Sequence, residues 1–164
     1  MKGQLSKEIE VPVPASDLWD VYGTLELVRL IHKLLPEFLH DFEVDDDVGN
    51  GGVGTMLKIV LPPGSPIAYY KEKFIKVDEE KRIKVVDVVE GGYLEVGFSL
   101  YRTTFEIIEK DEHSSSVVTT IDYELDDASA DNAAFVSIKP LEIVVESVGM
   151  YLHEKKNENH PANR

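Results

Sequence analysis

The chain has 164 residues, with 17 Lys and Arg against 31 Asp and Glu, and its formal net charge at pH 7 is therefore −14. This acidity disfavours binding to nucleic acid or to anionic membranes, because both need clustered basic side chains. Cysteine is absent, which excludes disulfides, thiolate catalysis and metal sites built on thiolates.

The amino-terminal segment carries charges within its first ten residues and has no apolar run. Neither a signal peptide nor a membrane span is expected, and the prediction is a cytoplasmic protein. Apolar and polar side chains then largely alternate from Leu5 to Val11, which predicts a strand. Pro12 and Pro14 end this strand.

Two short helices are predicted next. Ser16 is the predicted N-cap of the first helix, whose apolar residues begin at Leu18. The second helix has apolar residues at helical spacing from Leu25 to Leu35, and Pro36 ends it. Gly23 is the predicted junction between the two helices.

The periodicity changes to two after these helices, and turn residues interrupt it at intervals. This pattern predicts an antiparallel meander. Its strands are expected at residues 38–45, 54–61, 68–77, 81–90, 93–109 and 115–125.

A glycine-rich segment separates the first two strands of this meander. It lacks the Gly-Lys-Ser/Thr ending of a phosphate-binding loop, so its predicted role is a tight turn. The preceding Asp45-Asp46-Asp47 does not continue as an EF-hand calcium loop, and the histidines show no metal-ligand spacing. No metal and no cofactor is predicted. The glycines of this loop are Gly49, Gly51, Gly52 and Gly54.

Helical spacing returns from about Asp131, and Pro140 is expected to interrupt this last helix or to begin its main part. Residues 1–155 are predicted to form one domain, and residues 156–164 a flexible tail. The predicted fold class is α+β, with a curved seven-stranded antiparallel sheet around a long C-terminal helix and two short helices. Such a sheet can enclose a cavity for a small molecule, although close packing is the usual outcome.

This element order and the glycine-rich loop resemble the plant pathogenesis-related class 10 family, whose type member is the birch pollen allergen. Three stretches, 21–27, 70–74 and 89–94, are similar to its norcoclaurine synthase and norbelladine synthase branch. Residues 1–3 with 5–6, and residues 131–135, also resemble norbelladine synthase. The resemblance covers about residues 1–155 and implies a helix-grip, START-like fold with an internal ligand cavity.

The resemblance also implies an activity. Members of this branch condense an arylethylamine of the tyramine or dopamine type with an aldehyde, without a cofactor, in alkaloid metabolism. Carried over to this sequence, Lys84 would handle proton transfer at the carbonyl, Glu72 would act as the base and Tyr70 would orient Glu72. Each step moves a proton, and general acid–base catalysis contributes roughly 10²- to 10⁴-fold.

The spacing of these residues agrees with a shared site. Tyr70, Glu72 and Phe74 differ by two and therefore lie on one face of a strand. If the next turn has three residues, Lys84 lies opposite Phe74 and diagonal to Glu72, whereas a turn of two or four residues would reverse its face. Burial would lower the pKa of Lys84 and an ionised Glu72 would raise it, so the direction stays open.

One position departs from the family pattern. Thr103 stands where the resemblance places an aspartate in norcoclaurine synthase, and a threonine cannot supply a carboxylate. Condensation without ring closure is therefore the expected chemistry. The predicted lining of the ligand pocket consists of Phe74, Tyr93, Tyr101, Thr103, Leu141 and Val145.

Two non-catalytic alternatives remain open. The first is a carrier or sensor that binds a plant hormone or a phenolic metabolite in the same cavity, and Thr103 favours it. The second is a hormone receptor that engages a phosphatase. The joint occurrence of Tyr70, Glu72 and Lys84 favours the enzyme. For its assembly, a monomer or a weak dimer is expected.

Overall fold

Seven antiparallel strands form one sheet in the computed structural model, which describes residues 1–159. The sheet has the order β1-β7-β6-β5-β4-β3-β2, so the first strand pairs with the last and β2 to β7 form a meander. The strands are β1 (Lys2–Val11), β2 (Asp41–Asp46), β3 (Met56–Val60), β4 (Tyr69–Asp78), β5 (Ile83–Gly91), β6 (Phe98–Asp111) and β7 (Ser114–Leu125).

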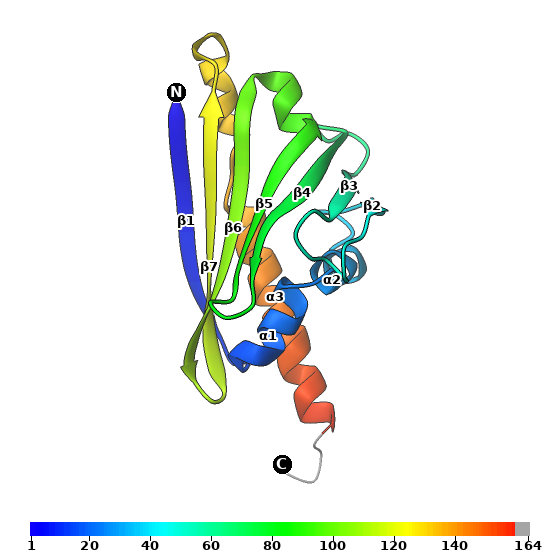
Figure 1. The fold of residues 1–164 in the computed structure, drawn as a ribbon, viewed down its shortest axis with the longest axis vertical. Helices are drawn as coiled ribbons and strands as arrows, with labels where there is room; N and C mark the ends of the chain where they lie inside the picture. Colours follow the sequence, from blue (N-terminus) through cyan, green and yellow to red (C-terminus); the bar gives the residue numbers. More distant parts are fainter. Residues whose placement is uncertain (160–164) are drawn as a thin grey trace.

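The long helix α3 (Lys139–Asn159) runs along one face of the sheet, with α1 (Ala15–Tyr22) and α2 (Glu26–Leu34) beside it at one end (Figure 1). Two 3₁₀ segments, η1 (Gly92–Val96) and η2 (Asp127–Phe135), precede β6 and α3. This arrangement confirms the predicted fold class. Within residues 1–159, no helix has the length and hydropathy needed to cross a lipid bilayer.

Two helix starts differ from the predictions. Pro14, not Ser16, is the N-cap of α1, which already begins at Ala15. The helical spacing from about Asp131 belongs in part to η2, and α3 begins only at Lys139. Pro140 begins the main helix because proline is tolerated in a first turn, where its missing N–H is not needed.

Two other boundaries also change. The prediction of one strand over 93–109 is wrong at its start, because residues 92–96 form η1 and Gly97, with a φ of +99°, ends it. At the carboxyl end, α3 continues to Asn159, so residues 156–159 are helical instead of belonging to a tail. The rest of the predicted tail, 160–164, lies outside the described residues.

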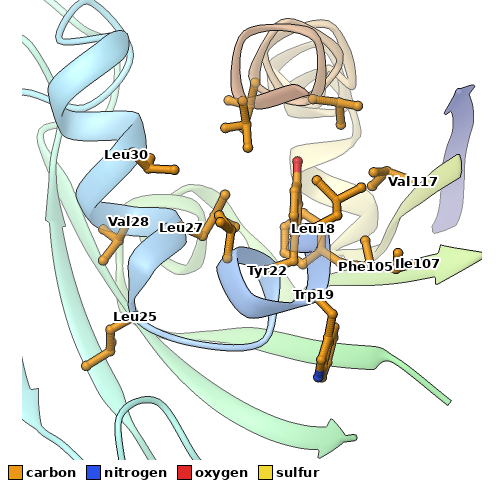
Figure 2. Close-up of a cluster of buried hydrophobic side chains, with 14 of the residues drawn as sticks. Leu18, Trp19, Tyr22, Leu25, Leu27, Val28, Leu30, Phe105, Ile107 and Val117 are labelled. Atoms are coloured by element: carbon orange, nitrogen blue, oxygen red, sulfur yellow. The ribbon is translucent and has the colours of Figure 1, made fainter. Parts of the chain in front are cut away.

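One end of the interior is filled by apolar side chains (Figure 2). Leu18 and Tyr22 of α1 are fully buried, and the Tyr22 ring meets the Phe105 ring edge to face at 5.3 Å between centroids. Val148 of α3 is also fully buried in this cluster. Burial of these side chains is the main source of stability at this end of the molecule.

The glycine-rich loop reverses the chain between β2 and β3 and also packs against the helices. Gly51 has a φ of +93°, and a Cβ atom there would lie 3.0 Å from the backbone nitrogen of Leu25. The loop is joined to the sheet because the Gly54 N–H donates to the Phe74 carbonyl at 2.8 Å. Glycine is therefore required here by close backbone approach as well as by the turn.

Candidate active site

An internal cavity lies between the sheet and the helices and has two adjoining lobes of about 290 and 110 Å³. The larger, outer lobe has the exposed residues Glu37, Ser137 and Pro140 on its wall, whereas every residue that lines the smaller, inner lobe is buried or half-buried. Both lobes share the wall residues Ile31, Leu39, Ile59, Tyr70, Glu72, Val86, Thr103 and Leu141.

The turn between β4 and β5 differs from the prediction. It contains the four residues 79–82, and Lys84 pairs with Val77 instead of Phe74. Arg82 provides the reversal with a φ of +53°, which a non-glycine residue adopts only occasionally. The Trp19 indole N–H donates to the Glu79 carboxylate at 2.6 Å and joins this turn to α1.

A β-bulge cancels the effect of the longer turn. The pairing of β4 with β5 shifts between Phe74 and Lys76, so that Phe74 faces Val86. Because side chains alternate along a strand, Lys84 then lies on the same face as Val86, toward the cavity. The predicted pairing partner of Lys84 is thus wrong, yet Glu72 and Lys84 both line the inner lobe.

Lys84 is almost completely buried, with 2% of its surface exposed. Its Nζ atom lies 4.2 Å from the centroid of the Phe74 ring and 5.9 Å from that of the Phe105 ring. Among the described residues, the Lys84 amino group has no ion-pair partner within 4.0 Å. It lines the inner lobe as a cation held by aromatic faces, without a carboxylate in direct contact.

Burial moves the pKa values of Glu72 and Lys84 toward each other. It raises the pKa of Glu72 from 4.5 to about 7, and the nearby Lys84 opposes this increase. It lowers the pKa of Lys84 from 10.5 to about 8, and the nearby Glu72 opposes this decrease. The direction that the sequence left open is therefore downward for Lys84. Near neutral pH each group can both give and accept a proton.

Three tyrosines extend the wall of the cavity into the outer lobe. The rings of Tyr93 on η1 and Tyr101 on β6 are stacked, with centroids 3.8 Å apart, and the Tyr70 ring lies 5.9 Å from that of Tyr93. Burial raises the pKa of all three phenols, and the nearby Glu72 adds to the increase for Tyr70. These phenols therefore stay protonated and can donate hydrogen bonds in the cavity.

Of the other residues predicted to line the pocket, three border the cavity and one lies in the apolar core. Thr103 and Leu141 line both lobes, and Phe74 lines the inner lobe. Val145 lines neither lobe and is buried in the apolar core, whereas the preceding Val144 lines the outer lobe. Successive helix residues point about 100° apart, so an error of one position moves a side chain from the cavity to the core.

Helix α2 and the turn that follows it also contribute to the cavity wall, and neither contribution was predicted from the sequence. Ile31 lines both lobes, and Glu37 lines the outer lobe. The apolar stripe of α2 predicted that Ile31 faces inward, but a stripe does not distinguish a packed neighbour from an empty space. No sequence pattern singled out Glu37, because a single acidic residue after a proline is ordinary in a surface turn.

The acidic run before the glycine-rich loop has structural contacts. The Asp45 carboxylate pairs with Lys71 at 2.9 Å, and the Asp47 carboxylate accepts the Gly51 N–H at 3.1 Å. Across residues 1–159, no group of three or more histidine, aspartate or glutamate side chains is arranged to hold a metal ion.

A curved antiparallel sheet, closed by a long C-terminal helix over a cavity with buried ionisable groups, defines a small-molecule-binding class of protein. The model of the pathogenesis-related protein Bet v 1 family matches residues 1–155, and the chain belongs to this family.

Two curated relatives and one solved structure make the relationship more specific. Norbelladine synthase from Narcissus pseudonarcissus is 45% identical over 158 residues, which cover 96% of each chain. S-norcoclaurine synthase 2 from Papaver somniferum is 37% identical over 95% of this chain and 68% of its own. Norcoclaurine synthase from Thalictrum flavum, solved in complex with dopamine and hydroxybenzaldehyde, aligns with a TM-score of 0.83 and 30% identity over 94% of this chain and 88% of that chain.

Proposed function

We propose that this protein is a cofactor-free enzyme that condenses an arylethylamine with an aromatic aldehyde to an imine. The observation that carries the proposal is that the half-buried Glu72 and the buried Lys84 line the wall of one cavity without forming a direct ion pair. The relatives support the chemical class, since one is named norbelladine synthase and another is solved with dopamine and hydroxybenzaldehyde.

The reaction needs a proton at the carbonyl oxygen and a base at the amine nitrogen. Glu72 accepts a proton from the substrate ammonium, and the neutral amine nitrogen then attacks the carbonyl carbon while the Lys84 ammonium protonates the carbonyl oxygen. Transfer of one nitrogen proton to the now neutral Lys84 amine gives a neutral carbinolamine. The protonated Glu72 then protonates the carbinolamine hydroxyl, water leaves as the C=N bond forms, and the resulting iminium loses its proton to solvent. The balance is one ammonium and one aldehyde to one imine, one water and one proton, with Glu72 and Lys84 back in their starting states.

The surroundings of the pair support this assignment of roles. A pKa of about 8 keeps Lys84 largely protonated at neutral pH, and a pKa of about 7 makes Glu72 available as a base. Tyr70 is raised in pKa by burial and by the nearby Glu72, so its phenol remains a donor that can orient the carboxylate. The apolar walls exclude water, which favours imine over carbinolamine.

Thr103 supports an open imine as the product. It lines both lobes and carries a hydroxyl, which cannot take the proton that an aromatic carbon loses when a ring closes. By resemblance, norcoclaurine synthase uses an aspartate at this position. We therefore infer that this enzyme stops before cyclisation.

Product formation tests the proposal. Tyramine and 4-hydroxybenzaldehyde are incubated with the protein, the imine is reduced with borohydride, and the secondary amine is quantified by mass spectrometry. The expected result is a rate well above the uncatalysed background for the wild type and near the background for Lys84→Ala. Equal product from both proteins, or none above background, would refute it.

A second candidate function is the binding of a phenolic ligand or hormone without chemistry. The neutral Thr103 and the largely apolar lobes favour it. Calorimetric titration of the ligand combined with product analysis separates the two functions. Saturable binding with recovery of unchanged tyramine and aldehyde indicates a carrier.

A further inference from the structure

The outer lobe has an uneven distribution of charge. Its wall carries two carboxylates, Glu37 at the exposed rim and Glu72 farther inside, and none of its described residues is Lys, Arg or His. The basic group of the cavity, Lys84, lines the inner lobe alone. A ligand that enters from the rim therefore meets negative charge first and positive charge last.

Glu37 is held at the rim by a well-anchored turn. The Phe38 N–H donates to the Leu35 carbonyl at 2.9 Å, and the His40 N–H donates to the Val60 carbonyl of β3 at 2.9 Å. Leu39, between these two residues, is 5% exposed and packs in the core. Within residues 1–159 the Glu37 carboxylate forms no ion pair, so its charge is not neutralised by a neighbour.

Lys84 is an independent indication that the cavity receives a polar ligand. The Lys84 residue is 98% buried and lines the inner lobe, and its amino group has no carboxylate within ion-pair distance among the described residues. A buried cation without such a partner is unfavourable unless its charge is used. The cavity thus has a polar group at each end and aromatic walls between them.

We propose that Glu37 makes the mouth of the cavity selective for cationic amines and against carboxylates. This inference rests on the proposed function, because it takes the cavity as the substrate site. An arylethylammonium is attracted by Glu37, then by Glu72, and is repelled by the protonated Lys84, so its nitrogen stops beside Glu72. A ligand with a carboxylate in place of the ammonium is repelled twice before it can reach Lys84.

A set of three ligands that share a 4-hydroxyphenylethyl group but differ in charge tests the effect of charge. Tyramine is a cation, 4-ethylphenol is neutral and 3-(4-hydroxyphenyl)propanoate is an anion, and all three carry the same phenol. Their dissociation constants are measured by calorimetry at low ionic strength, without aldehyde, so that no turnover is required. The proteins are the wild type, Glu37→Gln, Glu37→Lys and the control Glu43→Gln, which removes an exposed carboxylate of β2 that lines neither lobe.

The wild type is expected to bind tyramine most tightly and the propanoate most weakly. Glu37→Gln should weaken tyramine binding by about two- to fivefold, the size of an exposed ionic interaction, and should leave 4-ethylphenol unchanged. Glu37→Lys should weaken it further and strengthen propanoate binding. The differences should shrink in about 0.5 M salt because exposed charges are screened, and Glu43→Gln should behave as the wild type.

Two results overturn the inference: tyramine binding that is equal in the wild type and Glu37→Gln, or an equal loss for tyramine and 4-ethylphenol. The outcome separates from that of the proposed function. If binding depends on charge but no condensation occurs, charge selection by Glu37 is supported and the proposed enzymatic function is refuted. If condensation occurs but binding does not depend on residue 37, charge selection by Glu37 is refuted and the proposed enzymatic function is supported.

Discussion

Two neighbouring parts of the interior are built under the same sheet but differ in what fills them. Beneath α1, apolar side chains such as Leu18 and Tyr22 are fully buried against β6 and β7 (Figure 2). Beneath the β4–β5 hairpin, two ionisable groups, Glu72 and Lys84, line an open space. Stability is concentrated in the first part, and the second keeps buried polar groups that close packing would have excluded.

The cavity exists because the helices fill only one end of the space under the sheet. The apolar face of α1 and the part of α3 around Val148 pack in the filled end, whereas α2 lies over the cavity and contributes Leu27, Val28 and Ile31 to the wall of its inner lobe. Toward the other end, the wall is formed by tyrosines and short loops that leave about 290 Å³ empty in the outer lobe. Substitutions at the two ends should therefore separate stability from activity.

The largest effect on activity is expected for Lys84→Met. The condensation rate should fall by about 10²-fold or more, because the proton donor is lost. Stability at pH 7 should rise by at most about 3 kcal/mol. The folded pKa of about 8 lies below the ordinary 10.5, so the buried ammonium destabilises the fold fully below pH 8 and not above 10.5, and loss of the attraction between Lys84 and Glu72 offsets part of the gain. Urea unfolding and product assays measure the two effects.

The matched control for this substitution is Lys73→Met, which replaces an exposed lysine of β4. It should change neither the rate nor the stability. A Lys84→Met protein that is less stable than the wild type would contradict the view that Lys84 is kept for function, and unchanged activity would remove its catalytic role.

The next largest effect is expected on stability at the packed end. Leu18→Ala should lower the free energy of unfolding by about 2 to 5 kcal/mol, because it leaves a void in a filled core. Leu141→Ala, at the cavity wall, should cost about 1 kcal/mol, since the removed atoms already border an empty space. Thermal and urea unfolding compare the variants. An equal loss in the free energy of unfolding for Leu18→Ala and Leu141→Ala would contradict the view that Leu141 borders an empty space.

The pH dependence of kcat/KM tests whether Glu72 and Lys84, at the cavity end, act as base and acid. After correction for ionisation of the amine substrate, the rate should rise through a pKa of about 7 as Glu72 ionises and fall through about 8 as Lys84 loses its proton. Outside these limits it should change about tenfold per pH unit. The two values belong to the interacting pair.

Glu72→Gln tests the assignment of the acidic limb. It should remove this limb and move the alkaline limb to lower pH, because Glu72 raises the pKa of Lys84. Leu18→Ala should leave both limbs in place. An unchanged profile in Glu72→Gln would show that another group is the base.

The smallest effect is expected for Thr103→Asp. It places a carboxylate on a wall shared by both lobes and should give cyclised product from dopamine and an aldehyde at roughly tenfold above the uncatalysed rate, since a new base is not yet well positioned. Chromatography with mass spectrometry separates ring product from reduced imine. Cyclised product from the wild type at the same level would show that Thr103 does not limit the reaction.

Much of the fold follows from periodicity, because one face of each strand is buried and the alternation is visible in the residues. The shared face of Tyr70, Glu72 and Phe74 could be predicted for the same reason. The position of Lys84 could not be derived securely. The turn before it has four residues with Arg82 in the left-handed region, and neither this conformation nor the bulge near Ile75 has a sequence signal.

The lining of the cavity was harder to predict than the strands. Tyr93 stacks on Tyr101 although it belongs to η1 instead of a strand. Val144 and Val145 are chemically alike, and only the rotation of α3 decides which of them borders the cavity. No residues fill a cavity, so a cavity can be inferred from a sequence only through the residues that line it.

The most direct test of the account is the titration of Lys84 itself. In protein with ¹³C-labelled lysines, the Cε resonance of Lys84, assigned by its loss in Lys84→Met, is followed from pH 6 to pH 12. The expected midpoint is near 8, well below the ordinary lysine value of 10.5, and the midpoint should be still lower in Glu72→Gln. A midpoint at the ordinary lysine value that does not respond to Glu72→Gln would contradict it.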